Sequence, residues 1–289
     1  MHIKILIVVV RYNVPLERSE TLTSIANIFR NRPTLLGSFE VLLWDNSPEA
    51  LKALNLSFPC RYEHSKGNVG VGGAYNEALK MALSLNYSWL LLLDQDSVLP
   101  ENFLSRMLEY SKQLINDERV ASVAPGIWVN SHYMFPRFVT LGGTKACTPT
   151  FAGIEENECT TANTGCLMRV SALQAVGGYS KTFPFEFSDV YVFHQLHRAG
   201  TRLWVAGDLR IDHDLAILDY GGAMTPERYM SFIAAEDAFT RLYKGPIENA
   251  AYTMRLFARV LKQYTTYRDK HYAKTTLAHF LRRFRSQPN

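Results

Sequence analysis

The sequence predicts an α/β fold with a mostly parallel sheet, followed by a helical C-terminal region. Segments that are apolar at nearly every position alternate with segments of helical periodicity over residues 1–125. Continuous apolar segments of this kind are typical of strands that are buried on both faces of a parallel sheet. From residue 226 onward, every segment with a clear periodicity has the period of a helix.

The elements of the first half follow from local patterns along the chain. Ile3 to Val10 is almost wholly apolar, and the strand that ends at Trp44 is closed by the turn residues Asp45 to Pro48. A glycine-rich turn, Gly67 to Gly73, opens a helix, and Pro100 suits the start of the next one. We therefore predict strands at residues 3–10, 40–44, 60–63, 87–93 and 120–124, and helices at residues 16–29, 74–85 and 101–114.

The second half is less regular. Residues 125–188 are rich in Gly, Thr and Pro and show one strand-like stretch, residues 166–170. After them we predict a helix at residues 190–198, short strands at 203–206 and 210–213, and helices at 226–243 and 246–267.

Composition excludes several classes of protein. Hydrophobic residues make up 47% and charged residues 20% of the 289 residues, which is ordinary for a soluble globular protein with a core of its own. The four cysteines are too few and too scattered for a disulfide scaffold or a zinc site, which favours a reducing compartment. The apolar runs are too short to span a bilayer, and the first residues do not form a secretory signal. We expect a cytoplasmic protein.

Charge is concentrated at the C-terminal end. Residues 251–289 hold nine Lys/Arg and one acid, Asp269, whereas the rest of the chain is net negative. Leu277, Phe280, Leu281 and Phe284 fall on one face of a helix. This pattern predicts a helix that lies on an anionic membrane surface. The alternative is a helix packed on the body with a solvated basic side. We expect no nucleic-acid partner, because no nucleic-acid-binding motif is present.

Polar residues follow the predicted strands at the sheet edge where ligands bind in open α/β folds. Asp94 and Asp96 are two carboxylates that follow one buried strand, and a divalent cation such as Mg²⁺ would relieve their repulsion. The alternative is a strand-end turn in which Asp96 starts the next helix. His213 closes a later strand as a metal ligand or a polar strand end.

Two further features suggest a ligand site. The turn at Gly70 lets backbone amides approach a phosphate or ribose, although it matches neither the dinucleotide nor the P-loop pattern. Glu186 and Asp189 precede a helix, where a carboxylate in a cleft would serve as a general base. The alternative for Asp189 is the N-cap of that helix.

Together these segments resemble the inverting glycosyltransferases of family 2, which have the GT-A fold, over roughly residues 1–220. No single motif is decisive, but their order and spacing are specific. The segments that carry the resemblance are residues 8–13, 44–47, 68–70 with Asn76, 92–97, 164–169, 176–179, 185–189 and 211–213. The form Leu93-Asp94-Gln95-Asp96-Ser97 resembles the dTDP-rhamnosyltransferase branch.

The resemblance implies a role for each matching residue. Asp45 would accept the N3–H of a pyrimidine base. Asp94 and Asp96 would hold the ribose and a Mg²⁺ or Mn²⁺ ion, and His213 would complete the coordination of that ion. Asp189 would be the catalytic base, with Glu186 as the second candidate. The nucleotide-binding residues would be Tyr12, Asn13, Asp45, Asn68, Gly70, Asp94 and Gln95. Arg11 departs from the family, which has a small hydroxyl residue there, and residues 190–194 depart from its usual acidic segment.

The resemblance also implies a domain organisation and a function. Residues 1–222 would form a GT-A catalytic domain, with a nucleotide-sugar half (1–125) and an acceptor half (126–222), and residues 223–289 a helical region. The expected reaction is metal-dependent, inverting transfer of L-rhamnose from dTDP-L-rhamnose to a lipid-linked saccharide acceptor. It would serve bacterial surface polysaccharide (O-antigen or capsule) synthesis at the inner face of the cell membrane. Alternatives are a UDP-sugar donor, a nucleotidyltransferase, or a catalytically inactive nucleotide-sugar-binding module.

Overall fold

The computed structural model describes residues 3–213, 222 and 224–284, and these residues form two compact units. The first unit comprises Met1–Phe138 and Ala146–Asp214, and the second comprises Val139–Lys145 and Leu215–Asn289. Each unit is described by itself below.

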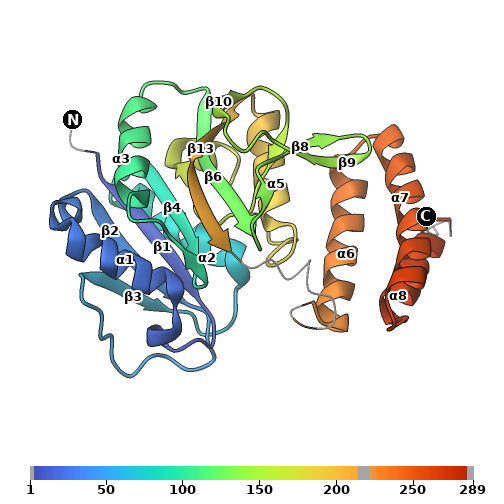
Figure 1. Cartoon of the computed structure of the whole chain (residues 1–289), viewed down its shortest axis with the longest axis horizontal. Coiled ribbons are helices and arrows are strands. Elements are labelled where there is room, and N and C mark those ends of the chain that lie inside the picture. The colour runs from blue at the N-terminus through green and yellow to red at the C-terminus, as the bar shows by residue number, and fades with distance from the viewer. Residues whose placement is uncertain (1–2, 214–221, 223, 285–289) are drawn as a thin grey trace. The chain divides into compact units, whose positions relative to one another are not determined.

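A single large sheet forms the centre of the first unit (Figure 1). Four parallel strands from the N-terminal part of the chain form one half of the sheet. The strand β12 lies beside them and is antiparallel to both of its neighbours. In spatial order the strands are β10 (Ala152–Glu155), β13 (Arg202–His213), β6 (Val120–Val129), β12 (Leu167–Arg169), β4 (Trp89–Asp94), β1 (Ile5–Arg11), β2 (Phe39–Asp45) and β3 (Cys60–His64). Two short strands pair at its edge, β5 (Ser97–Val98) with β13 and β7 (His132–Phe135) with β6.

Helices cover both faces of this sheet (Figure 1). On one face, Ile5, Ile7 and Val9 of β1 pack with α1 (Glu20–Asn31) and α3 (Phe103–Gln113). On the other face, Leu6 and Val8 pack with α2 (Gly70–Ser84), α4 (Val170–Ala175) and α5 (Ser188–Arg198). The run of apolar residues in β1 is explained by this double burial, each such side chain contributing about 1.5–3 kcal/mol. The prediction of an α/β fold of the GT-A type is therefore confirmed.

Several element boundaries differ from the predicted ones for physical reasons. The first helix begins at Glu20 because the Ser19 hydroxyl accepts a hydrogen bond from the Leu22 amide, and Leu16–Arg18 forms a separate 3₁₀ turn (η1). A second 3₁₀ turn, η2 (Pro33–Gly37), follows α1. The helix α2 begins at Gly70, four residues earlier than predicted.

The region between residues 125 and 188 contains more strand than predicted. The strand β6 continues to Val129, and a second sheet has the order β11 (Cys159–Thr160), β8 (Arg137–Thr140), β9 (Gly143–Ala146). The two strands predicted near residues 203 and 210 are one strand, β13, with a register shift between Ala206 and Arg210. Gly207 lies in this irregularity, and a Cβ there would come within 2.3 Å of the Phe151 carbonyl oxygen.

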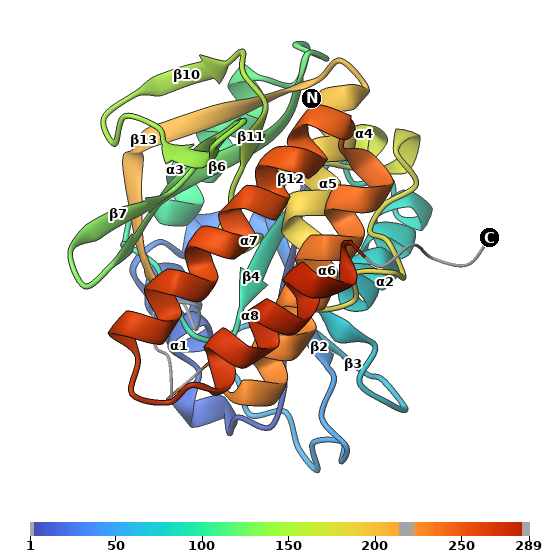
Figure 2. The same cartoon turned by 90° about the vertical axis from the view of Figure 1, so that its right-hand side faces the viewer.

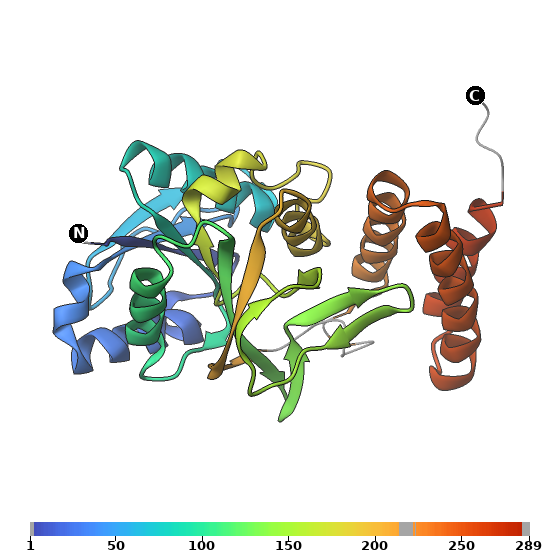
Figure 3. The same cartoon turned by 90° about the horizontal axis from the view of Figure 1, so that it is seen from above.

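The second unit contains, besides Val139–Lys145, the helices α6 (Pro226–Tyr243), α7 (Pro246–Thr266) and α8 (His271–Arg282) (Figures 2 and 3). Thr225 caps α6, with Pro226 at its first position, and this helix has the predicted bounds. The core of the unit is formed by Met224, Tyr229, Ile233, Tyr252, Leu256 and Tyr272.

Polar groups also tie these three helices together. Arg259 donates to both carboxylate oxygens of Glu236, at 2.6 and 2.9 Å, and Arg283 pairs with Asp237. The helix α8 buries Tyr272 and Thr276 against α6 and α7, so it packs within its own unit, and its contact with a membrane stays a prediction. No helix in the described ranges is long and apolar enough to cross a membrane.

Candidate active site

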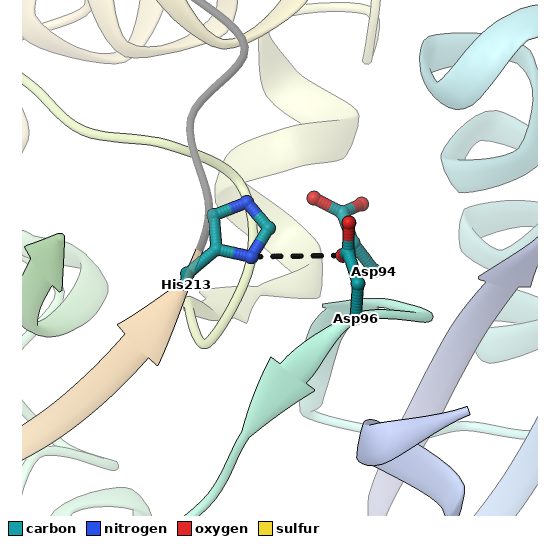
Figure 4. A group of neighbouring side chains, drawn as sticks. All are labelled: Asp94, Asp96 and His213. Carbon is teal, nitrogen blue, oxygen red and sulfur yellow. Dashed lines mark ion pairs between the residues drawn. The ribbon is translucent and has the colours of Figure 1, made fainter. Parts of the chain in front are cut away.

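The carboxyl edge of the main sheet brings two carboxylates and a histidine together. Asp94 ends β4, Asp96 follows it in the turn to β5, and His213 ends β13 (Figure 4). Pairing of β13 with β5 sets His213 opposite Ser97. One ligand atom from each of the three residues lies within 4.8 Å of the others, and His213 Nδ1 is 3.6 Å from Asp96 Oδ1. The structure thus brings His213 next to two carboxylates that lie more than 100 residues earlier in the sequence.

Neighbouring side chains fix this cluster in place. Tyr75 donates a hydrogen bond of 3.1 Å to Asp94 Oδ1, and the Asp94 amide donates to Thr164 Oγ1. The Ser97 hydroxyl lies 2.7 Å from Thr164 Oγ1 and 3.3 Å from His213 Nδ1. Burial raises the pKa of Asp94, and the nearby Asp96 carboxylate raises it further, although His213 and Tyr75 act in the opposite direction.

The donor set fits a divalent cation. Two carboxylates and one imidazole are ligands that Mn²⁺ accepts, and carboxylates together with phosphate oxygens suit Mg²⁺. Asp94 is partly buried whereas the Asp96 side chain is 56% exposed, so the cluster opens to solvent on one side. A diphosphate could complete the coordination from that side. The alternative in which Asp96 starts the next helix does not hold, because β5 follows directly and α3 begins at Phe103.

Asp45 lies at the same edge, at the end of β2. The strand β1 lies between β2 and β4, so it separates Asp45 from Asp94. Its side chain is fully buried and accepts hydrogen bonds from Arg11 Nη1 at 2.6 Å, from the Tyr62 hydroxyl at 2.9 Å and from the Ser47 amide at 2.9 Å. Burial alone would raise the pKa of Asp45, but the hydrogen bonds from Ser47, Arg11 and Tyr62 outweigh burial and lower it. These three donors already hydrogen-bond to the oxygens of Asp45. Its contact with the pyrimidine base of a nucleotide therefore stays a prediction.

The Arg11 pairing explains the residue that departs from the family pattern. Its Nε donates to the Val14 carbonyl at 2.7 Å and its Nη1 donates to Asp45 and to the Ser47 hydroxyl. The arginine thereby closes the loop after β1 onto the end of β2. A small hydroxyl residue at this position could not span that distance.

Tyr12, Asn13 and Gln95 lie in the loops after β1 and β4. Gln95 Oε1 accepts from the Tyr12 amide at 2.9 Å, and Gln95 Nε2 donates to the Tyr12 carbonyl at 3.3 Å. Asn13 has a positive φ of 54°, and its amide donates to the Ser47 hydroxyl. Gln95 therefore positions the Tyr12 loop, and Tyr12 is 44% exposed at the sheet edge.

Asn68 and Gly70 form the entry to α2. The Asn68 side chain accepts from the Gly70 amide at 3.0 Å, and the Asn46 side chain donates to the Gly70 carbonyl at 3.2 Å. Gly70 has φ +76°, and a Cβ there would lie 2.1 Å from the Pro184 carbonyl oxygen. Glycine is required because the chain near Pro184, which leads to Asp189, passes directly against this turn.

Asp189 lies in the first turn of α5, and Phe187 is the N-cap of that helix, so the N-cap alternative for Asp189 is wrong. The Val190 amide donates to Asp189 Oδ1 at 2.8 Å. The pKa of Asp189 is raised to about 6, mainly by burial. The charges of Glu186 and Asp94 also raise it, whereas the hydrogen bond from the Val190 amide lowers it. A carboxylate with such a pKa is suited to accept a proton near neutral pH.

Sequence reasoning missed a chain of hydrogen bonds that supports Asp189. Asn76 Nδ2 donates to the Tyr179 carbonyl and Asn76 Oδ1 accepts from the Tyr179 amide, at 2.9 and 2.8 Å. The Tyr179 hydroxyl donates to Asn163 Oδ1, and Asn163 Nδ2 donates to the Ser188 hydroxyl beside Asp189. Asn76 and Tyr179 belong to the segments that carry the family resemblance, which was the only available signal.

Comparison with known proteins adds a family and a fold. The family model described as "Glycosyl transferase family 2" matches residues 6–177, which is more than half of the chain. No curated protein matches the sequence.

Solved structures share the fold at low identity. GalNAc-T7, solved with UDP, GalNAc and Mn²⁺, superposes with a TM-score of 0.60 at 12% identity over 98% of this chain. Our chain spans 56% of that structure's length. Residues 1–349 of S. aureus TarS give a TM-score of 0.51 at 15% identity, covering 97% of this chain and 89% of TarS. The same part of TarS in complex with UDP gives 0.52 at 13% identity, covering 91% and 73%. The family match and the GT-A architecture agree, and the chain belongs to glycosyltransferase family 2.

Proposed function

We propose that this glycosyltransferase moves a sugar from a nucleotide-sugar donor to a saccharide acceptor with inversion at the anomeric carbon. The observation that carries the proposal is the cluster of Asp94, Asp96 and His213 at the carboxyl edge of the sheet, near enough to Asp189 for the charge of Asp94 to raise the pKa of Asp189. The two carboxylates and the imidazole would hold Mg²⁺ or Mn²⁺ against the donor diphosphate. When bound, the cation supplies charge stabilisation for the departing diphosphate.

The residues of the chain would divide the remaining work between them. Asp189 takes the proton of the acceptor hydroxyl as that oxygen attacks the anomeric carbon from the face opposite the nucleoside diphosphate. Burial raises the pKa of Asp189, and the charge of the nearby Glu186, the second candidate for the base, adds to this increase. Tyr12, Asn13 and Asp45 would surround the base of the nucleotide, while Asn68 and Gly70 would line its pocket. A single displacement of this kind inverts the anomeric centre.

The favoured donor is dTDP-L-rhamnose, and it rests on the form of the segment Leu93–Ser97, which resembles rhamnosyltransferases. A UDP-sugar is the alternative, supported by the UDP in the structures of GalNAc-T7 and TarS. The acceptor would be a lipid-linked saccharide of bacterial surface polysaccharide synthesis, which would place the enzyme at the inner face of the cell membrane. A catalytically inactive nucleotide-sugar-binding module is the remaining alternative.

A donor screen tests this proposal. The purified protein is incubated with dTDP-rhamnose and a panel of UDP-sugars, with Mn²⁺, with Mg²⁺ or with a chelator, and release of nucleoside diphosphate is measured. We expect metal-dependent release that is fastest with dTDP-rhamnose. Faster release of nucleoside diphosphate from a UDP-sugar would identify that sugar nucleotide, and not dTDP-rhamnose, as the donor. Nucleotide binding without release from any donor, even with saccharide acceptors added, would favour the inactive module.

A further inference from the structure

The helix α7 carries a row of apolar side chains that its own unit does not bury. Ile247 and Met254 are 71% and 67% exposed, and the row continues toward the end of the helix. Successive members are separated by three, four or seven positions, which places them on one side of an α-helix. The row consists of Ile247, Met254, Phe257, Leu261 and Tyr264.

The helix α8 extends this row into a surface. Leu277 and Leu281 are exposed on it, and Phe284, two residues beyond its end, is 66% exposed. Phe280 connects the two helices, because its ring centroid lies 5.7 Å from that of Phe257 on α7 and 5.0 Å from that of Phe284. Figure 2 shows α7 and α8 side by side. We call these eight exposed residues together with Phe280 the α7–α8 face.

Positive charge accompanies the α7–α8 face. The basic residues Arg259 and Arg283 pair with carboxylates of α6 inside the unit. Four other cations on α7, α8 and the turn between them are exposed, and none of them forms an ion pair in the part of the chain that the structure describes. They are Lys262, Arg268, Lys274 and Arg282.

We propose that the α7–α8 face binds an anionic lipid surface, with α7 lying flat in the headgroup region beside α8. A surface to which eight exposed apolar side chains contribute marks an interaction site, and basic residues along an amphipathic helix are attracted to anionic lipids. A second copy of the chain would bring the same four cations against each other. Charge complementarity therefore favours a lipid partner over self-association.

This surface differs from the one expected from the sequence in its main element. The sequence pattern predicted a membrane-binding side for residues 277–284 alone. The apolar row on α7 was not predicted, because it lacks the arginine-rich segment that accompanies residues 277–284. Phe280, which the pattern placed on the lipid side, packs partly against the core of the unit. The proposed lipid-binding face adds a binding surface to the membrane location given under the proposed function. It rests on the proposed function only for the location of the acceptor.

A vesicle sedimentation assay tests the proposal with the full chain. Vesicles of phosphatidylcholine with about one-third phosphatidylglycerol are compared with pure phosphatidylcholine, because the proposal requires anionic headgroups. We expect binding to the anionic vesicles only, weakened by salt because exposed charges are screened. Leu261→Glu combined with Leu281→Glu should reduce binding at least about tenfold, since it places two carboxylates on the face.

The matched control is Leu85→Glu, an exposed leucine at the C-terminal end of α2 in the first unit. It should leave vesicle binding unchanged, and donor turnover in solution should be unchanged in all variants. Failure of the unaltered chain to sediment, or equal sedimentation of the double variant, would overturn the proposal. Concentration-dependent dimers abolished by the double variant, without vesicle binding, would assign the face to self-association. Absence of donor turnover in the unaltered chain would instead count against the proposed function, whether or not the chain binds vesicles.

Discussion

Asp189→Asn is expected to abolish sugar transfer while leaving nucleotide binding intact. The substitution keeps the size of the side chain and its hydrogen bond from the Val190 amide, but an amide cannot accept the proton of the acceptor hydroxyl. General-base catalysis contributes about 10²–10⁴-fold, and we expect kcat to fall by that factor. Steady-state kinetics, together with calorimetric titration of the nucleoside diphosphate, measures the two properties separately.

The pH dependence supplies an independent check on the same residue. The raised pKa of Asp189, about 6, means that the carboxylate becomes protonated and inactive as the pH falls through this value. In the unaltered enzyme kcat/KM should therefore fall about tenfold per pH unit below pH 6, and this limb should be missing from the residual activity of Asp189→Asn. Glu77→Gln, on the exposed surface of α2, is the matched control. Unchanged turnover in Asp189→Asn, with loss in Glu186→Gln, would move the base to Glu186.

Asp96→Ala is expected to remove metal dependence together with activity. Asp96 is the most exposed member of the cluster and contributes little to the core, so its loss should leave the fold intact. Charge stabilisation by a bound cation is worth several kcal/mol, so we expect a loss of at least about 100-fold in kcat. Rates measured against Mn²⁺ and Mg²⁺ concentration, with a chelated blank, check this.

Asp212→Ala is the control for a change of charge near the site. Asp212 precedes His213 on β13, but its carboxylate pairs with Arg210 and is exposed. This variant should keep both its activity and its response to metal. An Asp96→Ala enzyme that retained full metal-stimulated turnover would show that the cation, if needed at all, binds elsewhere.

Much of the fold could be predicted because its signals are local. The unbroken apolar run from Ile5 to Val9 predicts a doubly buried strand, and Thr225 with Pro226 marks the start of α6. The region after residue 125 could not be predicted as well. Its short strands pair with partners far along the chain, so their pattern depends on tertiary contacts such as that of Gly207 with Phe151.

The candidate site was predictable in its strand-end residues and less so in what supports them. Residues at the carboxyl ends of β2, β4 and β13 lie at one edge because the sheet aligns these ends, which is a property of the topology. The pairing of Arg11 with Asp45 and the hydrogen bonds of Thr164 have no sequence pattern, since each depends on loops that adopt one particular path. The apolar row on α7 was hidden because a helical pattern does not say whether an apolar side is buried.

The proposed function depends above all on Asp94 and Asp96 holding the diphosphate of the donor through a divalent cation. Anomalous diffraction from crystals grown with Mn²⁺ and thymidine or uridine diphosphate can locate such a cation. We expect a manganese peak within bonding distance of Asp96 and of the diphosphate oxygens, with His213 beside it. A nucleotide bound at this edge without any manganese peak near Asp94 and Asp96, or bound away from the edge altogether, would refute this metal site.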